Sequence, residues 1–173
     1  GTNEVQDDFG HGTHVAGTIA ATGQNGIGVI GVAWQSRIMA LKGLDAHGGG
    51  LESNLADAIL YAAENGANVI NASWGGFGQA QVIDDAIAVA AAHGVVFVAA
   101  AGNSNVDVEN NLSGPFFPAA NHNAITVAAI DHLSQKAFFS NFGTKIDLAA
   151  TGGGDGGETG NFRTVLSLRA SGA

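Results

Sequence analysis

The residues with the clearest chemical potential lie between Asp7 and Ala21, in the segment DDFGHGTHVAGTIAA. His11 stands between Gly10 and Gly12, so we expect an open backbone and an imidazole that reaches a cleft from the start of a helix. A neutral imidazole in that place can act as a general base, because it can take a proton from a hydroxyl nucleophile. Taken alone, however, a histidine beside glycines is better explained as an ordinary turn residue.

The neighbours of His11 suggest two further roles. His14 follows three residues later, and two histidines at that spacing can share a helix face and a metal ion. No further ligand pattern of the zinc type follows in the sequence, so we reject a zinc site at His11 and His14. Asp7 and Asp8 precede His11 by four and three residues. That proximity suits helix capping or a place at the rim of a substrate cleft.

The rest of the chain alternates apolar, β-branched runs with helical patterns. The helices are expected near 14–21, at 51–65 with Leu51, Leu55, Ile59 and Ala62 on one face, and at 79–93 with Val82, Ala86 and Val89 on one face. Strands are expected at 37–44, 67–73, 95–101 and 124–130, and a short one at 165–168 after a glycine-rich loop at 152–160. Near-continuous apolar strands between helices predict an α/β fold. We expect a three-layer, doubly wound, mostly parallel sheet with helices on both faces.

Composition limits the class of protein. The 173 residues are 46% hydrophobic and carry a net charge of −9, which fits one folded domain and argues against nucleic acid as a partner. There is no cysteine, so disulfides and thiol catalysis are excluded. No apolar run reaches the length of a membrane span, and the first residues do not form a signal peptide.

Three segments together resemble one known family. HGTHVAGTIAA (11–21) is similar to the histidine box of the subtilisin-like serine proteases. NASWGG (71–76) resembles the substrate-binding strand of that family, and VVFVAAAGNSN (95–105) resembles its oxyanion segment. The segments occur in the family order, and the resemblance runs from about Asp7 to Ala150. It implies a subtilisin-like fold, polypeptide substrates, serine endopeptidase chemistry through an acyl-enzyme, and secretion.

The resemblance also implies roles for individual residues. His11 would be the general base, and Asn103 would donate its side-chain amide to the oxyanion. In subtilisin itself, loss of such a donor costs roughly 10²–10³ in turnover. The substrate-binding residues would be Ser73, Trp74 and Gly75 on one wall, where a peptide adds as a strand, and Ala100, Ala101 and Gly102 on the opposite wall. Small residues there predict a preference for a large apolar side chain before the scissile bond, while Trp74 is equally compatible with an ordinary core position.

Two catalytic parts of the family pattern have no counterpart in the sequence. The family carries its triad aspartate on a strand further upstream and its nucleophilic serine in a Gly-Thr-Ser-Met-Ala motif that opens a helix. Ser167 and Ser171 lack that setting. We therefore expect residues 1–173 to form a single partial catalytic domain that lacks the N-terminal Asp strand and the C-terminal Ser helix. The isolated chain is expected to be inactive.

The segment GQNGIGVIG (23–31) resembles the calcium loop of the family. By that resemblance the Ca²⁺ ligands would be the side-chain oxygen of Asn25 and the backbone carbonyls of Thr22, Ile27 and Val29. A carboxylate ligand would have to come from another part of the domain, and a turn without metal is the alternative. The same residues match GxGxxG, but they follow a helix and lead to a strand, the reverse of a dinucleotide site.

Two other functions are considered. A non-catalytic pseudoprotease domain could bind extended peptides along Ser73–Gly75, but it would need neither His11 nor Asn103. A nucleotide-binding α/β domain is compatible with the topology, but no phosphate loop occurs in the right context. The serine endopeptidase is therefore the preferred hypothesis.

Overall fold

The computed structural model describes residues 5–154 and 165–170 of the chain. The chain divides into two compact units, Gly1–Ala58 with Leu166–Ala173, and Ile59–Val165. Each unit has its own architecture and is described by itself.

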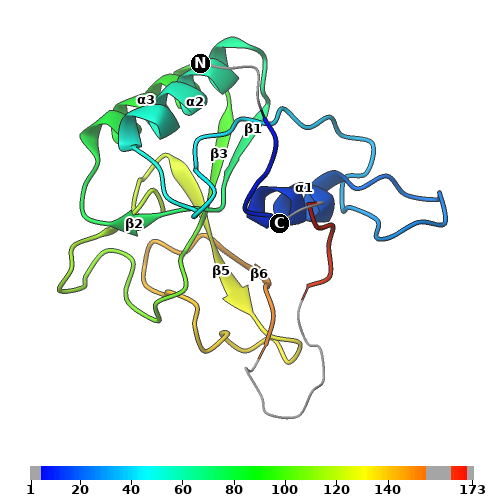
Figure 1. Cartoon of the computed structure of the whole chain (residues 1–173). Helices are drawn as coiled ribbons and strands as arrows, with labels where there is room; N and C mark the ends of the chain where they lie inside the picture. The colour runs from blue at the N-terminus through cyan, green and yellow to red at the C-terminus, as the bar shows by residue number, and fades with distance from the viewer. Residues whose placement is uncertain (1–4, 155–164, 171–173) are drawn as a thin grey trace. The chain divides into compact units, whose positions relative to one another are not determined.

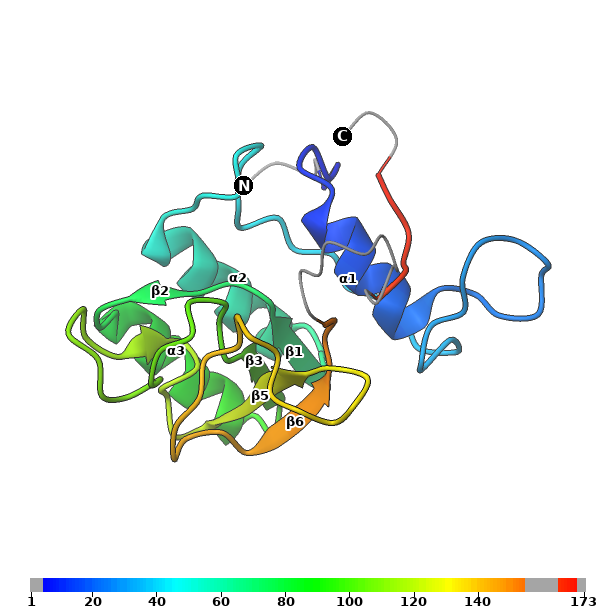
Figure 2. The same ribbon diagram turned by 90° about the horizontal axis from the view of Figure 1, so that it is seen from below.

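The second unit is built on a parallel sheet. Its strands are β1 (Val69–Ala72), β3 (Val96–Ala100), β5 (Ala124–Ile130) and β6 (Leu148–Thr151), in the order β1-β3-β5-β6 (Figure 2). All three pairings are parallel, with Ala72 opposite Ala99 and Ala100 opposite Val127. The strands predicted at 67–73, 95–101 and 124–130 are thus confirmed, and with them the parallel α/β sheet.

Helix α3 (Gln81–Ala92) crosses over between β1 and β3 and packs against β3 (Figure 1). Its buried face consists of Ile83, Ala86, Ile87 and Ala90, whose i, i+3, i+4, i+7 spacing defines one helix stripe. The predicted face was wrong in part, because Val82 and Val89 are exposed. Gly94 follows the helix with a φ of 76°, the left-handed conformation that ends helices at glycine.

A second, smaller sheet was not predicted from the sequence. Strand β2 (Gly76–Phe77) pairs antiparallel with β4 (Phe116–Phe117). The Phe77 and Phe116 rings meet edge to face, with centroids 5.2 Å apart. Two-residue strands lack an alternating pattern long enough to be recognised, and these two pair across almost 40 residues of chain.

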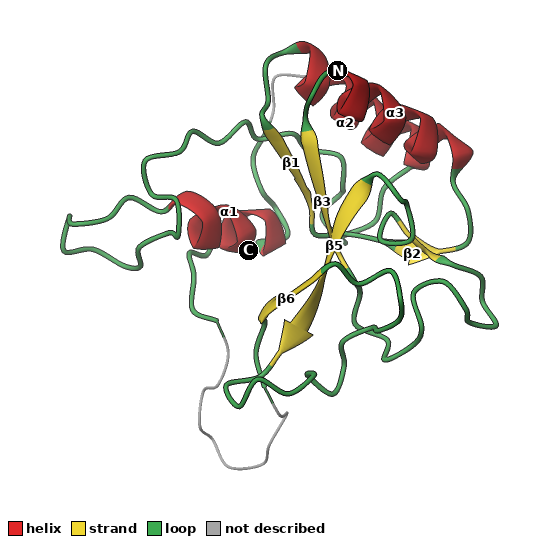
Figure 3. Cartoon of the chain, turned by 180° about the vertical axis from the view of Figure 1, so that it is seen from behind, coloured by secondary structure: helices red, strands yellow, loops and turns green. Residues whose placement is uncertain are grey.

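The first unit contains α1 (His11–Ala20) and a long irregular stretch. Helix α1 begins three residues before the predicted start at 14, and residues 21–51 form turns and loops (Figure 3). The strand predicted at 37–44 is wrong. No neighbouring strand pairs with this segment in the described part of the chain, and its Ile38, Met39 and Leu41 are exposed. An apolar run without a ladder partner does not become a strand.

The segment predicted as a short strand at 165–168 is also irregular within the described residues. Instead it packs against α1, where the Ser167 hydroxyl donates to the His14 carbonyl at 2.5 Å. A Cβ on Gly17 would lie 2.8 Å from Leu168 Cγ, so only glycine allows this approach. The glycine-rich loop at 152–160 lies outside the described residues from 155 on.

Helix α2 (Glu52–Glu64) confirms the helix predicted at 51–65. Leu55, Ile59 and Ala62 of the predicted face are buried, whereas Leu51 precedes the helix and is exposed. None of the helices in the described part of the chain has the length and apolar character required to cross a membrane.

Candidate active site

The start of α1 is held by the carboxylate of Asp7. Its Oδ1 accepts hydrogen bonds from the backbone N–H groups of Phe9 (3.1 Å) and Gly10 (2.8 Å). Its Oδ2 accepts from the backbone N–H and the hydroxyl of Thr13, both at 2.7 Å. The N-cap residue is Gly10, which has no side chain, so Asp7 supplies the capping oxygen from three residues upstream.

These hydrogen bonds favour the charged form of the carboxyl. The Thr13 hydroxyl, followed by the Gly10 and Thr13 amides, holds the pKa of Asp7 well below its usual range. A negative charge at a helix N-terminus is also stabilised by the helix dipole. The expected capping role of this position is therefore seen in the structure. Asp8 instead pairs with Lys42 at 2.8 Å.

His11 is the first residue of α1, and its side chain is exposed. Neither of its ring nitrogens forms a hydrogen bond within residues 5–154 and 165–170, so the described contacts leave the imidazole available to a substrate or nucleophile. In the same residues, no group of three or more His, Cys, Asp or Glu side chains is arranged to hold a metal ion. The local geometry is compatible with the predicted general base, which stays a prediction.

In the second unit, the two predicted substrate-binding walls lie side by side. Parallel strands end at the same edge of a sheet, and the pairing of Ala72 with Ala99 places Ser73 beside Ala100. The Ser73 hydroxyl accepts from the Asn71 side chain at 2.9 Å. Ala101 is buried, whereas Trp74 is half-buried.

The glycines of the two walls contact one aromatic ring. A Cβ on Gly75 or on Gly102 would lie 2.6 Å from the same atom, Cε1 of Phe116. Phe116 is 8% exposed, so its ring is enclosed at this place. From the sequence, the small wall residues predict open space between the walls. In the structure, this space holds the ring of Phe116, which the sequence analysis did not identify.

Asn103 follows Gly102, whose φ of 103° turns the chain out of β3, and its side chain is exposed. The turn is held by Asn141, which is fully buried. Its Nδ2 donates to the Ala101 carbonyl at 2.8 Å, and its Oδ1 accepts from the Ser104 and Val106 amides at 2.9 and 3.2 Å. Its backbone N–H donates to the Gly102 carbonyl at 3.0 Å. Backbone on both sides of Asn103 is thereby fixed by one residue.

Lys136 supports the same turn from outside. Its ammonium donates to Asn105 Oδ1 at 2.7 Å and to the Ser140 carbonyl at 3.1 Å. The same nitrogen lies 5.5 Å from the centre of the Phe142 ring. Neither Asn141 nor Lys136 was identified as functional from the sequence. The only local signal for Asn141 is a polar residue within the apolar context FFSNFG.

The predicted calcium ligands lie in one loop of the first unit. Asn25 and Ile27 are exposed, and Asn25 Oδ1 already accepts from the Ile27 amide at 3.0 Å. Thr22, Asn25, Ile27 and Val29 would offer four oxygens and no carboxylate, whereas Ca²⁺ takes six to eight oxygens. These four residues therefore fit only part of a calcium site.

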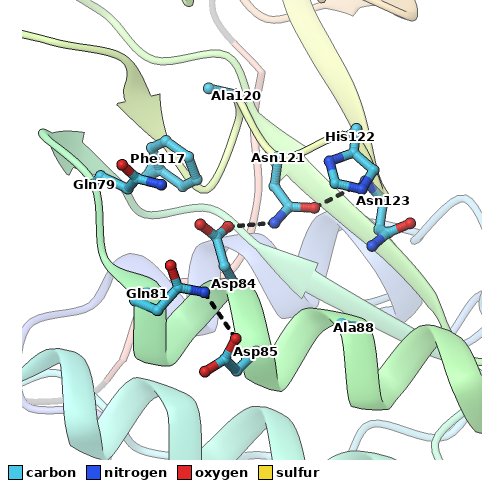
Figure 4. Close-up of a pocket in the computed structure, with 10 residues that line it drawn as sticks. All are labelled: Gln79, Gln81, Asp84, Asp85, Ala88, Phe117, Ala120, Asn121, His122 and Asn123. Carbon is cyan, nitrogen blue, oxygen red and sulfur yellow. Dashed lines mark hydrogen bonds between the residues drawn. The ribbon is translucent and has the colours of Figure 1, made fainter.

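A polar cavity of about 390 Å³ lies elsewhere in the second unit (Figure 4). The Asn121 amide donates to Asp84, and Gln81 donates to Asp85 at 2.8 Å. Phe117 lines the cavity together with the side chains of α3 and of the loop before β5. None of the predicted site residues belongs to it.

The comparisons with known proteins identify the family. Residues 1–171 match the model of the Subtilase family, Peptidase_S8. The chain belongs to this family. It is 45% identical over 142 residues to a thermophilic serine proteinase of Bacillus sp. (strain AK1), covering 82% of this chain and 34% of that protein. It is 41% identical over 152 residues to Subtilisin Savinase of Lederbergia lenta, covering 88% and 54%.

Solved structures agree with the family assignment. A cold adapted subtilisin-like serine proteinase matches with a TM-score of 0.74 and 35% identity, over 86% of this chain and 50% of that one. The predicted resemblance and the α/β subtilisin-like fold class are confirmed. The chain spans about half the length of Subtilisin Savinase and of this solved subtilase. His11, the predicted general base, belongs to the first unit, and Asn103 and the two predicted walls belong to the second.

Proposed function

We propose that the whole protein is a serine endopeptidase in which this chain supplies His11 as general base and Asn103 as oxyanion donor. The observation that carries the proposal is the turn held by Asn141. It keeps the Asn103 side chain exposed directly after a wall predicted to bind substrate. A preorganised donor of this kind stabilises the charge that develops on a carbonyl oxygen during acyl transfer.

In the proposed reaction, a serine hydroxyl attacks the scissile carbonyl while His11 takes its proton. The oxyanion accepts a hydrogen bond from the Asn103 amide. The C–N bond then breaks, the leaving amine receives the proton from His11, and water hydrolyses the acyl-enzyme by the same route. We assign no residue of this chain as the nucleophile or as the triad aspartate, so other parts of the whole protein would supply both. The 173-residue chain alone is expected to be inactive.

The test is to compare the whole protein with its Asn103→Ala and His11→Ala variants on a peptide substrate. Asn103→Ala is expected to lower kcat by roughly 10²–10³ with little change in KM, because the donor acts in the transition state. Asn110→Ala, an exposed asparagine in the following loop, is the matched control and should keep full turnover. If the wild type binds peptides but neither hydrolyses them nor reacts with a fluorophosphonate, the peptide-binding alternative replaces this proposal.

We further propose that the loop with Thr22, Asn25, Ile27 and Val29 contributes to a structural Ca²⁺ site whose carboxylate comes from elsewhere in the whole protein. The support is the set of four oxygens in one loop. Because none of these oxygens is charged, a carboxylate from elsewhere would be needed to complete the site. Ca²⁺ should then raise the Tm of the whole protein, and Asn25→Ala should abolish most of that rise. A Ca²⁺-dependent Tm that Asn25→Ala leaves unchanged would place the ion elsewhere.

Secretion is proposed on the similarity to subtilisins alone. Recovery of the whole protein and its peptidase activity from the culture medium, rather than from cells, would support it. Retention of both inside intact cells would contradict it.

A further inference from the structure

Phe116 lies where the two predicted substrate-binding walls meet. It belongs to β4, which pairs with β2, and β2 directly follows the first wall. It is 8% exposed, and its ring packs edge to face against Phe77. The ring is thus fixed by neighbours on its own small sheet, independently of any substrate.

The contacts of the Phe116 ring limit the space between Gly75 and Gly102. A Cβ on Gly75 would lie 2.6 Å from Phe116 Cε1 and 3.1 Å from its Cζ. A Cβ on Gly102 would lie closest to Asn141 Nδ2, and 2.6 Å and 2.8 Å from the same two atoms of Phe116. Even one methyl group on either wall would therefore overlap the ring. The space between Gly75 and Gly102 is occupied by the edge of Phe116.

The neighbouring Phe117 provides a contrast. Successive residues of a strand point to opposite sides, and Phe117 lines the polar cavity with Gln79 and Asp84 (Figure 4). Of these two adjacent phenylalanines, Phe116 places ring atoms against both Gly75 and Gly102, whereas Phe117 approaches Gly75 with its backbone carbonyl oxygen, 2.7 Å from the position of a Cβ. Phe116 is therefore the residue whose ring approaches the glycines of both walls.

We propose that Phe116 limits the size of the substrate side chain that enters between the two walls, so that the enzyme cleaves after small residues such as alanine. This inference rests on the proposed endopeptidase function and deepens it. It reverses the preference expected from the sequence, where the small wall residues indicated a large apolar side chain. A large substrate side chain would have to displace a buried ring that is held by Phe77.

The experiment uses the whole protein and peptide p-nitroanilides that differ only in the residue before the scissile bond: alanine, leucine or phenylalanine. The measured quantity is the ratio of kcat/KM for the alanine substrate to that for the phenylalanine substrate. Both values come from one preparation, so the fraction of folded enzyme cancels. We expect the wild type to favour alanine by at least about tenfold, since single methylenes already change such ratios by about 10–200-fold.

Two variants locate the cause. Phe116→Ala should lower the ratio by about tenfold or more and favour the phenylalanine substrate. Phe116→Leu keeps an apolar side chain in the core and should give an intermediate ratio, which covers the case in which the alanine variant does not fold. Phe117→Ala is the matched control on the opposite side of the strand, and it should leave the ratio unchanged.

The outcomes separate the two proposals. A wild type that cleaves the phenylalanine or leucine substrate best, or a ratio that neither Phe116 variant changes, would overturn the role of Phe116 and leave the endopeptidase intact. Cleavage of none of the three substrates, together with no reaction with a fluorophosphonate, would reject the endopeptidase itself.

Discussion

The two polar side chains that this chain would contribute to catalysis are presented by different physical means. His11 stands at the start of a helix that is capped by one charged, partly exposed carboxylate, Asp7. Asn103 stands in a turn that is fixed by one neutral, fully buried amide, Asn141. Asp7 lies four residues before His11, whereas Asn141 lies 38 residues after Asn103.

The difference has consequences for stability. A capping carboxylate at the surface contributes modestly, and its contribution depends on its ionisation. A buried side-chain amide stabilises the fold because its partners, shielded from water, would be left unpaired without it. Its charge does not change with pH. The turn that holds Asn103 should therefore be costly to break at every pH, whereas the start of α1 should be cheaper to break and sensitive to acid.

The largest effect is expected for Asn141→Ala. It would leave the buried Ala101 carbonyl without its partner, at about 1–3 kcal/mol, and would remove the part-buried hydrogen bonds to the Ser104 and Val106 amides, at about 0.5–1.5 kcal/mol each. We expect a loss of about 3 kcal/mol or more in the free energy of unfolding, and this loss should be the same from pH 5 to pH 8. Urea unfolding gives the energy, and hydrogen exchange at Ser104 and Val106 shows whether the turn has opened.

Asn123→Ala is the control for this change, because Asn123 is exposed and its side chain lies in the polar cavity instead. Unchanged exchange at Ser104 and Val106 in Asn141→Ala would show that the turn holds without its amide.

A smaller effect is expected for Asp7→Ala, about 1 kcal/mol at neutral pH. The pKa of Asp7 is lowered in the folded chain, so its stabilisation is fully present above the unfolded carboxyl pKa of about 3.9. The stabilisation is lost as the pH falls from there towards the lowered pKa. The difference between wild type and variant should therefore be constant from pH 5 to pH 8 and shrink below about pH 4.

Thermal unfolding at a series of pH values measures this difference, with exchange of the Thr13 amide as the local readout. Asp8→Ala serves as control, since the Asp8 carboxylate pairs with Lys42, whereas the donors at the helix start bond to Asp7. A difference between wild type and Asp7→Ala that persists undiminished below pH 3 would contradict a role for the charge.

The smallest effect is expected for Thr13→Val. This change removes the hydroxyl that contributes most to the lowered pKa of Asp7 but leaves the Thr13 and Gly10 amides in place. Stability should fall by about 0.5 kcal/mol, the lower end of the range for one hydrogen bond, because three backbone amides still bond to Asp7. The pKa of Asp7, followed by NMR titration of its carboxyl carbon, should rise towards the usual value without reaching it. An unchanged pKa would mean that the backbone amides alone hold the charge.

The sequence predicted elements best where one local pattern decides them. Residues 124–130 were predicted as a strand and form β5 with the same bounds, because an apolar, β-branched run is buried there. The run at 37–44 has the same local character but no partner strand in the described structure, and a strand requires a partner. Helix capping was one of the two roles predicted for Asp7, and it could be predicted because the contacts of Asp7 lie within six residues.

Phe116 and Asn141 could not be recognised in the same way. Their contacts with Gly75, Gly102 and Ala101 join positions that are 14 to 41 residues apart in the sequence. The pairing of β1 with β3 and of β2 with β4 brings Phe116 to the two glycines, and the loop between β5 and β6 brings Asn141 to Ala101. No short motif encodes either arrangement. The family resemblance indicated the walls, and it gave no information about the ring that lies between them.

The pairing of Ala72 with Ala99 has a consequence for insertions and deletions. One residue added to β1 would advance Gly75 by about 3.3 Å along the sheet edge, enough to separate it from the ring that it shares with Gly102. One residue added to the exposed loop around Asn110 would leave both strand ends in place. Changes in chain length should therefore accumulate in that loop among functional descendants of this chain and be absent from β1 and β3.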